Sequence, residues 1–340
     1  MFFYTIIGGY VLTSIILFKY PRLWHKKKNI KFTCQHISHR GGAGESYENT
    51  MAAFRRLSKN KLSSLDILII IFNYRAVAIG TQMLELDCQL TKDGQVIVSH
   101  DQNLLRSTGV DKNVSQVNFK DLPILKPTLP IDFNPEVEFV GSGNPEERKI
   151  PLLKDVFEEF PNFPVNIDIK MNDDQLIEKV SELIKLYNRH EYTVWGNFND
   201  EITTKCYKAN PSINLLFSMR RVILLILFMY TGLLPFIPLK ESHLEIFLPS
   251  IYLRRRSTPV ASFLSYEKII CRSIDLLLMR PCLFNHLKAR GIQVYFWVLN
   301  SEEEFQQAFE LGATGVMTDY PTKLKKFLEK RTNPLVNAQS

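Results

Sequence analysis

HRGGAGESYENTMAAF, from His39 to Phe54, is the stretch of sequence that decides the fold. An apolar run from Cys34 to Ser38 leads directly into His39 and Arg40, and two glycines then let the backbone turn sharply. The pattern predicts a strand followed by charged side chains and a turn. A hydrophobic scaffold that places ionisable side chains at a strand end is typical of an active site.

A second stretch, TQMLELDCQLTKDGQVIVSHDQNLLRSTG from Thr81 to Gly109, continues this pattern. Alternation in a strand puts Glu85 and Asp87 on one face and Leu84 and Leu86 on the other. Two carboxylates about 7 Å apart along a strand repel each other unless a cation or a proton lies between them. Carboxylate oxygens suit hard cations, so a divalent metal such as Mg²⁺ or Ca²⁺ is predicted.

A third apolar run, Val96 to Ser99, ends in His100 and Asp101. Two histidines beside a carboxylate-bound cation suggest a general acid and a general base around a metal-held anion. Each short motif is common by itself, and a histidine at a strand end is more often a satisfied surface group. The prediction therefore depends on the order and phase of the three runs.

The chain resembles the glycerophosphodiester phosphodiesterase family, and within it the membrane-anchored branch that acts as lysophospholipase D. The two stretches above carry the resemblance, together with VNIDIK (165–170), GIQVYFWVLN (291–300) and GATGVMTDYP (312–321). These segments follow the family's order over most of the chain. The resemblance implies an α/β fold, a (β/α)8 TIM barrel, with the reaction at the C-terminal ends of its strands.

The resemblance also implies roles for individual residues. His39 and His100 match the acid/base pair, and Arg40 matches the residue that holds the phosphate. Glu85 and Asp87 match metal ligands. His100 also fits a metal ligand, and the sequence leaves both roles open.

The family's third metal ligand is usually a glutamate two residues before a lysine, and here Asp168 and Lys170 occupy these places. Aspartate is one methylene shorter, which affects its reach to the metal. Glu48 and Asn49 match an element that supports the site, although Tyr47 replaces its proline. We expect Lys170 to join Arg40 in binding the substrate.

This arrangement suits a phosphodiester. The cation, Arg40 and Lys170 would neutralise charge on the phosphoryl oxygens, while one histidine removes a proton from the attacking oxygen and the other protonates the leaving alcohol. The two imidazoles must then differ in protonation, which predicts a bell-shaped pH profile. Either a substrate hydroxyl or water fits as the attacking oxygen.

The remaining sequence independently favours alternating strands and helices, and so a parallel sheet in one catalytic domain over 34–330. The predicted strands add five to the three early runs: Val165 to Ile169, Tyr192 to Trp195, Asn214 to Phe217, Val294 to Leu299 and Gly315 to Thr318. The predicted helices include Asp173 to Tyr187, Glu302 to Leu311 and Thr322 to Lys330. The proline-rich region between Asp101 and Pro151 predicts an irregular loop over the barrel mouth.

The net charge, the motifs and the cysteines of the chain limit the classes of partner it is expected to bind. The 42 Lys and Arg against 35 Asp and Glu give a net charge of +7, which suits an anionic membrane surface or nucleic acid. No zinc-finger, RNP or basic-helix motif is present, so nucleic acid is discounted as a partner. The five cysteines, Cys34, Cys88, Cys206, Cys271 and Cys282, show no CxxC spacing and are predicted to be reduced, buried thiols of a cytosol-facing domain.

The N-terminus carries a membrane signal. Residues 2–18 are uncharged and mostly apolar, and a basic linker follows over 19–33. At about 1.5 Å per residue this stretch is just long enough to span a bilayer. A retained single-pass anchor with the barrel in the cytoplasm is predicted, in the endoplasmic reticulum because the span is short. A helix buried in a soluble core is the alternative.

Four further features of the sequence carry expectations. The apolar run over 222–239 contains two prolines and is interpreted as a monotopic or re-entrant element beside the site mouth that admits an acyl chain, or else as a buried barrel helix. The insert over 57–75 fits a third membrane-contacting element, an alternative exon or an erroneous gene model.

Trp297 and Asn300 follow a strand and are expected to line the site, unless the tryptophan belongs to the core. A flexible polar tail is expected over 331–340.

The predicted function is metal-dependent hydrolysis of lysophospholipids to lysophosphatidic acid and a head-group alcohol, such as choline or ethanolamine. The first alternative is a phosphodiesterase acting on water-soluble glycerophosphodiesters. The second is a catalytically impaired membrane scaffold, in which the insert or the short Asp168 abolishes turnover. Metal identity, oligomeric state and protein partners are not determined by the sequence.

Overall fold

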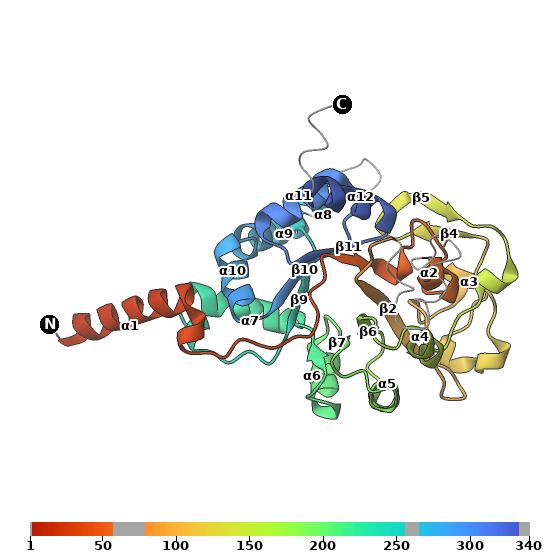
Figure 1. The fold of residues 1–340 in the computed structure, drawn as a ribbon, viewed down its shortest axis with the longest axis horizontal. Coiled ribbons are helices and arrows are strands. Elements are labelled where there is room, and N and C mark those ends of the chain that lie inside the picture. The colour runs from red at the N-terminus through yellow and green to blue at the C-terminus, as the bar shows by residue number, and fades with distance from the viewer. Residues whose placement is uncertain (1, 57–78, 256–264, 333–340) are drawn as a thin grey trace, which may run out of the picture.

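Eight short parallel strands form a nearly closed barrel in the computed structural model, which describes residues 2–56, 79–255 and 265–332 (Figure 1). Their order around the barrel is β8-β7-β6-β2-β1-β11-β10-β9. A single bridge between Leu216 and His243 joins the two end strands. The strands are β1 His36–Ser38, β2 Met83–Leu90, β6 Val165–Ile169, β7 Thr193–Gly196, β8 Asn214–Leu215, β9 His243–Ile246, β10 Gln293–Phe296 and β11 Gly315–Thr318. The predicted TIM barrel is confirmed.

Helices surround the strands (Figure 1). They are α2 Met51–Arg56, α4 Leu153–Glu159, α5 Asp174–Leu186, α6 Asp200–Ala209, α7 Met219–Tyr230, α8 Pro249–Arg255, α9 Ser265–Leu278, α10 Pro281–Ala289, α11 Glu302–Leu311 and α12 Pro321–Thr332. α3 Leu105–Thr108 lies in the long connection after β3. The three helices predicted from the sequence are confirmed to within two residues at each end.

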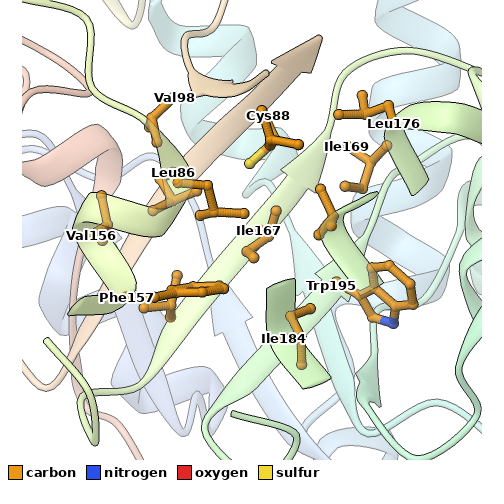
Figure 2. Packing of buried hydrophobic residues seen from close by; sticks show 14 of the residues in the cluster. Leu86, Cys88, Val98, Val156, Phe157, Ile167, Ile169, Leu176, Ile184 and Trp195 are labelled. Atoms are coloured by element: carbon orange, nitrogen blue, oxygen red, sulfur yellow. The ribbon is translucent and has the colours of Figure 1, made fainter. Parts of the chain in front are cut away.

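Alternation along each strand separates the core from the site. On β2, Leu84 and Leu86 belong to the apolar layer between the barrel and its helices, where Leu86 packs near Val156 and Phe157 (Figure 2). Glu85 and Asp87 therefore point into the barrel. Below them, Met83 belongs to a separate apolar cluster that fills the barrel interior with side chains such as Tyr295. The barrel is thus apolar deep inside and polar at its C-terminal mouth.

One predicted barrel strand is wrong. The run Val96 to Ser99 forms β3 Val96–Val98, which pairs antiparallel with β2 outside the barrel path. Only five residues separate β2 from β3, whereas a parallel crossover needs a dozen or more, so these strands can pair only as a hairpin. The eighth barrel strand is β9, which sequence analysis missed because its four residues follow a proline-containing apolar segment.

The region between Asp101 and Pro151 is more ordered than predicted. It contains a two-stranded hairpin, β4 Thr128–Ile131 and β5 Asn134–Val140, and short 3-10 turns at Val114–Gln116, Phe119–Asp121 and Pro145–Arg148. Tyr47, which replaces a proline, anchors this hairpin. Its ring packs edge-on against Phe139, and its hydroxyl donates to the carbonyl of Pro127 (3.3 Å) and accepts from the amide of Gly143 (3.2 Å).

The helix α1 Phe2–Lys19 projects beyond the barrel (Figure 1) and is long and apolar enough to cross a membrane. Its C-terminal half docks on the barrel's outer helices. Tyr10 and Ser14 donate hydrogen bonds to the carbonyls of Thr231 (2.6 Å) and Gly232 (2.7 Å), and Phe18 stacks on His286. The 3-10 turn Pro21–Leu23 follows. The end of α1 is therefore fixed to the barrel by these contacts.

The apolar run over 222–239 forms most of α7 and the 3-10 turn Leu234–Phe236. Val222 and Leu225 are buried, as in the barrel-helix interpretation, whereas Ile223 and Leu227 are exposed. α7 starts at the barrel mouth after β8 and runs away from it, so only its first turn lies beside the site. Membrane contact through its exposed face stays a prediction.

Several expectations fall on the remaining residues. The insert over 57–75 lies outside the described residues, as does the tail from 333, although Arg331 and Thr332 still belong to α12. Four cysteines are buried free thiols as predicted, but Cys282 is exposed.

Removing a large side chain from the apolar layer between the barrel and its helices should lower the stability of the fold. Ile167 on β6 is fully buried among the residues of Figure 2. We expect Ile167→Ala to lower the free energy of unfolding by about 2–5 kcal/mol, because it leaves a cavity. Urea unfolding of the detergent-solubilised chain followed by circular dichroism measures this change. Leu186→Ala, at an exposed position on α5, should change stability by less than about 1 kcal/mol.

Candidate active site

A tight turn directly after β1 builds one side of the site. It is the 3-10 turn His39–Gly41, in which Arg40 has a φ of 50°. Gly41 and Gly42 have φ values of 78° and 93°, and a Cβ atom on them would come within 2.9 Å of Phe54 and 2.8 Å of Pro321. The two glycines are therefore required for both conformation and space. They let His39 and Arg40 point into the barrel mouth.

His39 is oriented by an aspartate that sequence analysis did not assign. Its Nδ1 lies 2.7 Å from the Oδ1 of Asp319, which follows β11. Asn300 fixes this aspartate, because its Nδ2 donates to Asp319 Oδ2 (2.9 Å) and its Oδ1 accepts from the Asp319 amide (3.0 Å). With Nδ1 donating to a carboxylate, Nε2 faces the mouth, 3.9 Å from Glu85. Asn300 supports the site from a buried position and does not line it.

Arg40 is buried and surrounded by carboxylates. Its Nη1 donates to Glu48 (2.9 Å) and to Asp132 (2.8 Å), and its Nε lies 3.4 Å from Asp87. Its backbone amide donates to Glu85 (2.8 Å). Burial by itself would lower the pKa of Arg40, but the surrounding carboxylates raise it well above its usual value. A fixed, permanently charged guanidinium at this place suits an anion such as a phosphate.

The pKa values of Glu85 and Asp87 shift in opposite directions although the two residues are only two positions apart on one strand. Burial and the neighbouring charge of Asp87 raise the pKa of Glu85 well above its usual value. Burial also opposes ionisation of Asp87, but Lys170 and Arg40 hold the pKa of that carboxyl far below its usual range. Asp87 is therefore an anion, and Glu85 is a carboxyl group that lacks enough positive charge nearby.

Lys170 lies between two carboxylates. Its Nζ is 2.6 Å from Asp168 and 2.8 Å from Asp87, and Asn197 donates a further hydrogen bond to Asp168 (2.5 Å). Burial lowers the pKa of Lys170, and the two aspartates more than reverse this effect. The lysine thus sits at the mouth as predicted, but its contacts in this structure are to acidic residues. Its predicted contact with substrate remains a prediction.

A further acidic residue on β9 was missed. Glu245 accepts a hydrogen bond from Asn166 Nδ2 (2.7 Å), and burial, with added repulsion from Glu85 and Asp168, raises its pKa to about 8. The signal was present in the sequence, because His243 and Glu245 alternate with Leu244 and Ile246 as Glu85 and Asp87 alternate with leucines. This four-residue strand was hidden by the apolar segment before it.

The carboxylate side chains at the barrel mouth offer oxygen atoms, the type of ligand that a hard divalent cation prefers. Carboxylates from β2, β6 and β9 lie close enough to repel one another, and burial together with this repulsion raises the pKa values of Glu85 and Glu245. Among the described residues, no three His, Cys, Asp or Glu side chains are gathered into a coordinating group. Lys170 instead bridges Asp87 and Asp168. The predicted metal ligands Glu85, Asp87, His100 and Asp168 therefore remain predictions.

His100 stands at the rim and is held by the residue that follows it. Its Nδ1 lies 2.8 Å from Asp101 Oδ1, and Arg106 Nε donates to the other oxygen of Asp101 (2.6 Å). The antiparallel hairpin brings it to this place, because the amide of Ser99 donates to the carbonyl of Asp87 (2.9 Å). Its role as base or ligand stays open.

The residues expected to support the site do contact it. Glu48 bridges Arg40 and Arg106, and Asn49 Nδ2 donates to Asp87 (2.8 Å). Arg106 and Asp132, which pair across 3.6 Å, were not predicted. Asp132 lies at the tip of the β4–β5 hairpin, so the hairpin that Tyr47 contacts places the Asp132 carboxylate against Arg40.

Aromatic side chains line the opposite side of the mouth. Phe133, next to Asp132, lies edge-on to the His39 ring with centroids 5.6 Å apart. Trp297 lies 5.9 Å from Phe133 and 6.1 Å from Phe247. Trp297 is half-buried: it lines the neighbouring cleft and also packs against the apolar cluster of the barrel interior, and its contact with substrate stays a prediction.

The sequence model of the glycerophosphoryl diester phosphodiesterase family matches residues 72–323. The human protein named lysophospholipase D GDPD1 is 53% identical over 322 residues, which are 95% of each chain. Human lysophospholipase D GDPD3 is 38% identical over 323 residues, covering 95% of this chain and 94% of that protein.

Solved structures share the fold at low sequence identity. A glycerophosphoryl diester phosphodiesterase from Silicibacter pomeroyi is 15% identical with a TM-score of 0.59, over 90% of this chain and 96% of that one. A phosphodiesterase from Oleispira antarctica, solved with the product sn-glycerol-3-phosphate, is 18% identical with a TM-score of 0.56, over 88% of this chain and 98% of that one.

The pKa of Glu245 predicts how stability depends on pH. Between its unfolded value near 4.3 and its folded value of about 8, the folded chain binds more protons than the unfolded chain, so stability falls as pH rises. Glu245→Gln removes this loss. In a chelating buffer, we expect the melting temperature of the variant relative to the wild type to rise from pH 5 to pH 9.

Glu182→Gln, at an exposed position on α5, is the matched control and should show no such trend. A Glu245→Gln variant that tracks the wild type across this range would contradict the raised pKa.

Proposed function

The chain belongs to the glycerophosphoryl diester phosphodiesterase family and is a phosphoric diester hydrolase, and from this premise we propose that it is a lysophospholipase D. The proposed substrate is a lysophospholipid, and the proposed products are lysophosphatidic acid and the head-group alcohol. The observation that carries the proposal is the juxtaposition of the His39–Asp319 pair, the buried Arg40 and the acidic residues at the mouth of the barrel. The names of the two human relatives, at 53% and 38% identity, support the lipid substrate.

The chain's own residues account for binding and proton transfer. Arg40 offers its guanidinium to the phosphoryl oxygens, for which it exchanges its bond with Asp132 at the hairpin tip. His39 moves a proton at Nε2, and Asp319 at Nδ1 stabilises its charged form. His100 provides a second imidazole across the mouth for the other proton. Phe133 and Trp297 exclude water from this side of the phosphate.

A divalent cation, Mg²⁺ or Ca²⁺, is the proposed cofactor. Glu85 and Asp87 would hold it, together with His100, Asp168 or Glu245. When bound it would neutralise negative charge on the phosphoryl oxygens. The uncompensated acidity around Glu85 supports this proposal.

We further propose that α1 is a single-pass anchor in the endoplasmic reticulum membrane, with the barrel in the cytoplasm. The apolar composition of α1 and the lysines after it, Lys26, Lys27 and Lys28, support this orientation. Membrane lipids would then lie beside the far end of α7, where α1 docks.

The lipid substrate and the cation are tested together. The membrane-bound chain should release choline and lysophosphatidic acid from lysophosphatidylcholine, and a chelator should abolish the release until Mg²⁺ or Ca²⁺ is restored. His39→Ala should reduce the rate by roughly 10²–10⁴-fold, since it removes one acid/base group. Mass spectrometry of both products measures the reaction.

Release of glycerophosphate and choline from glycerophosphocholine alone would support the water-soluble substrate instead. A folded chain that turns over neither compound and binds no cation in calorimetry would indicate a scaffold.

Asp319 is expected to act as a positioning residue, because its carboxylate orients the His39 ring through Nδ1. Asp319→Asn replaces that carboxylate with an amide, so the orientation of the ring should be lost and kcat should drop at least about tenfold. The KM should change little, because Asp319 is placed behind His39 and not at the substrate. Rates measured over a range of substrate concentrations separate the two effects, and thermal melting checks that the variant is folded. An unchanged kcat in a folded variant would contradict the role of Asp319.

A further inference from the structure

A cleft of about 700 Å³ opens beside the catalytic residues, between the ends of β9 and β10 and the helices α8 and α9. α9 forms one wall with Ile270 and Ile274, and α8 contributes Ile251. Phe247 and Trp297 stand at its inner end. Its volume falls within the roughly 300–1,000 Å³ usual for pockets that enclose a small ligand.

The cleft is continuous with the catalytic centre. Phe133 lines the cleft and contacts the ring of His39. From there, aromatic contacts run to Trp297, to Phe247 and then to Tyr252, with centroids 5.4 to 6.1 Å apart. A ligand whose phosphate lies at Arg40 therefore has an apolar path that begins beside its reacting group.

Three charged residues line the cleft, and two of them are engaged elsewhere. Arg255 donates to the carbonyl of Val298 (3.0 Å) and to Glu304 (2.6 Å), and Asp132 pairs with Arg40. The third is Glu267 on α9. The rest of the surface is mainly aliphatic and aromatic, so over most of the cleft a charged head group would lose its hydration without gaining a partner.

We propose that this cleft binds the acyl chain of the substrate. The proposal rests on the lysophospholipase D function above and deepens it by assigning where the hydrocarbon lies: the phosphate at Arg40, the glycerol beside Phe133 and Trp297, and the chain between α8 and α9. The apolar run over 222–239 supplies none of the lining residues, because α7 reaches the cleft through Met219, which precedes that run.

The surface outside the cleft fits this occupant. Exposed apolar side chains continue from its rim along two neighbouring helices, whose ends are joined by a hydrogen bond from Tyr230 to the carbonyl of Leu277 (3.2 Å). They are Ile223, Leu227 and Tyr230 on α7 and Ile269, Ile270, Leu276 and Leu277 on α9. The helix α1 docks at the far end of α7. A lipid can thus reach the cleft along an apolar surface that starts beside the proposed anchor.

Chain length provides the test. Each methylene buried in an apolar site changes affinity up to about fourfold, so an occupied cleft makes turnover depend on chain length. The full chain in one fixed detergent is assayed with two lysophosphatidylcholines, whose acyl chains have 6 and 16 carbons. We expect the wild-type kcat/KM to rise at least tenfold from the short to the long chain.

Ile270→Trp fills the cleft from its partly exposed wall and should reduce that rise to less than threefold. Ile269→Trp, the neighbouring position on α9 that does not line the cleft, is the matched control and should keep the wild-type rise. Ile270→Glu, which places a charge in the cleft without added bulk, should act as Ile270→Trp does, so a folding defect in one variant leaves the other.

A chain-length rise that survives in both Ile270 variants overturns the proposal and indicates that the cleft holds something else, such as a segment of another protein. A wild type that cleaves both lipids equally also overturns it, while leaving lysophospholipase D activity intact. A wild type that cleaves neither lipid removes the proposed function itself.

Discussion

The structure depends on the burial of one cation, Arg40, among carboxylates that would repel one another without it. Inside a protein neither charge is tolerated alone, and breaking such a network typically costs about 3–5 kcal/mol. Arg40 contacts Glu48, Asp87 and Asp132, and its amide binds Glu85, so one residue ties together β1, β2 and the β4–β5 hairpin. The two glycines after it follow from this requirement, because only they allow the turn that aims Arg40 inward.

The barrel separates this polar layer from the apolar packing that stabilises the fold. Alternating side chains on each short strand send leucines and isoleucines outward to the helices and carboxylates inward to the mouth. Lys170 then compensates Asp87 and Asp168, whereas Glu85 and Glu245 are left without enough positive charge. The same layer continues into aromatic side chains at Phe133 and Trp297, where polar chemistry gives way to an apolar cleft.

Local patterns of apolar alternation and charged strand ends predicted every barrel strand except β9 and placed His39, Arg40, Glu85 and Asp87 at strand ends, while the family resemblance implied the barrel. It failed where the determinant is not local. The short link between β2 and β3 makes Val96–Val98 a hairpin partner, and β9 is too brief to stand out from the apolar segment before it. Asp319, Arg106 and Asp132 were missed as site residues because their contacts with His39, Glu48 and Arg40 join positions 58 to 280 apart in the chain, which no spacing reveals.

These observations give an account in which a charged barrel mouth holds a phosphodiester while an adjoining cleft holds its hydrocarbon. The claim on which all else rests is that Arg40 is the phosphate site. Calorimetric titration of the folded full chain with glycerol 3-phosphate tests it most directly, comparing the wild type with Arg40→Lys. Lysine keeps the charge but loses the planar fork of donors. The account predicts at least tenfold weaker binding by the variant; equal affinity in two folded proteins would contradict it.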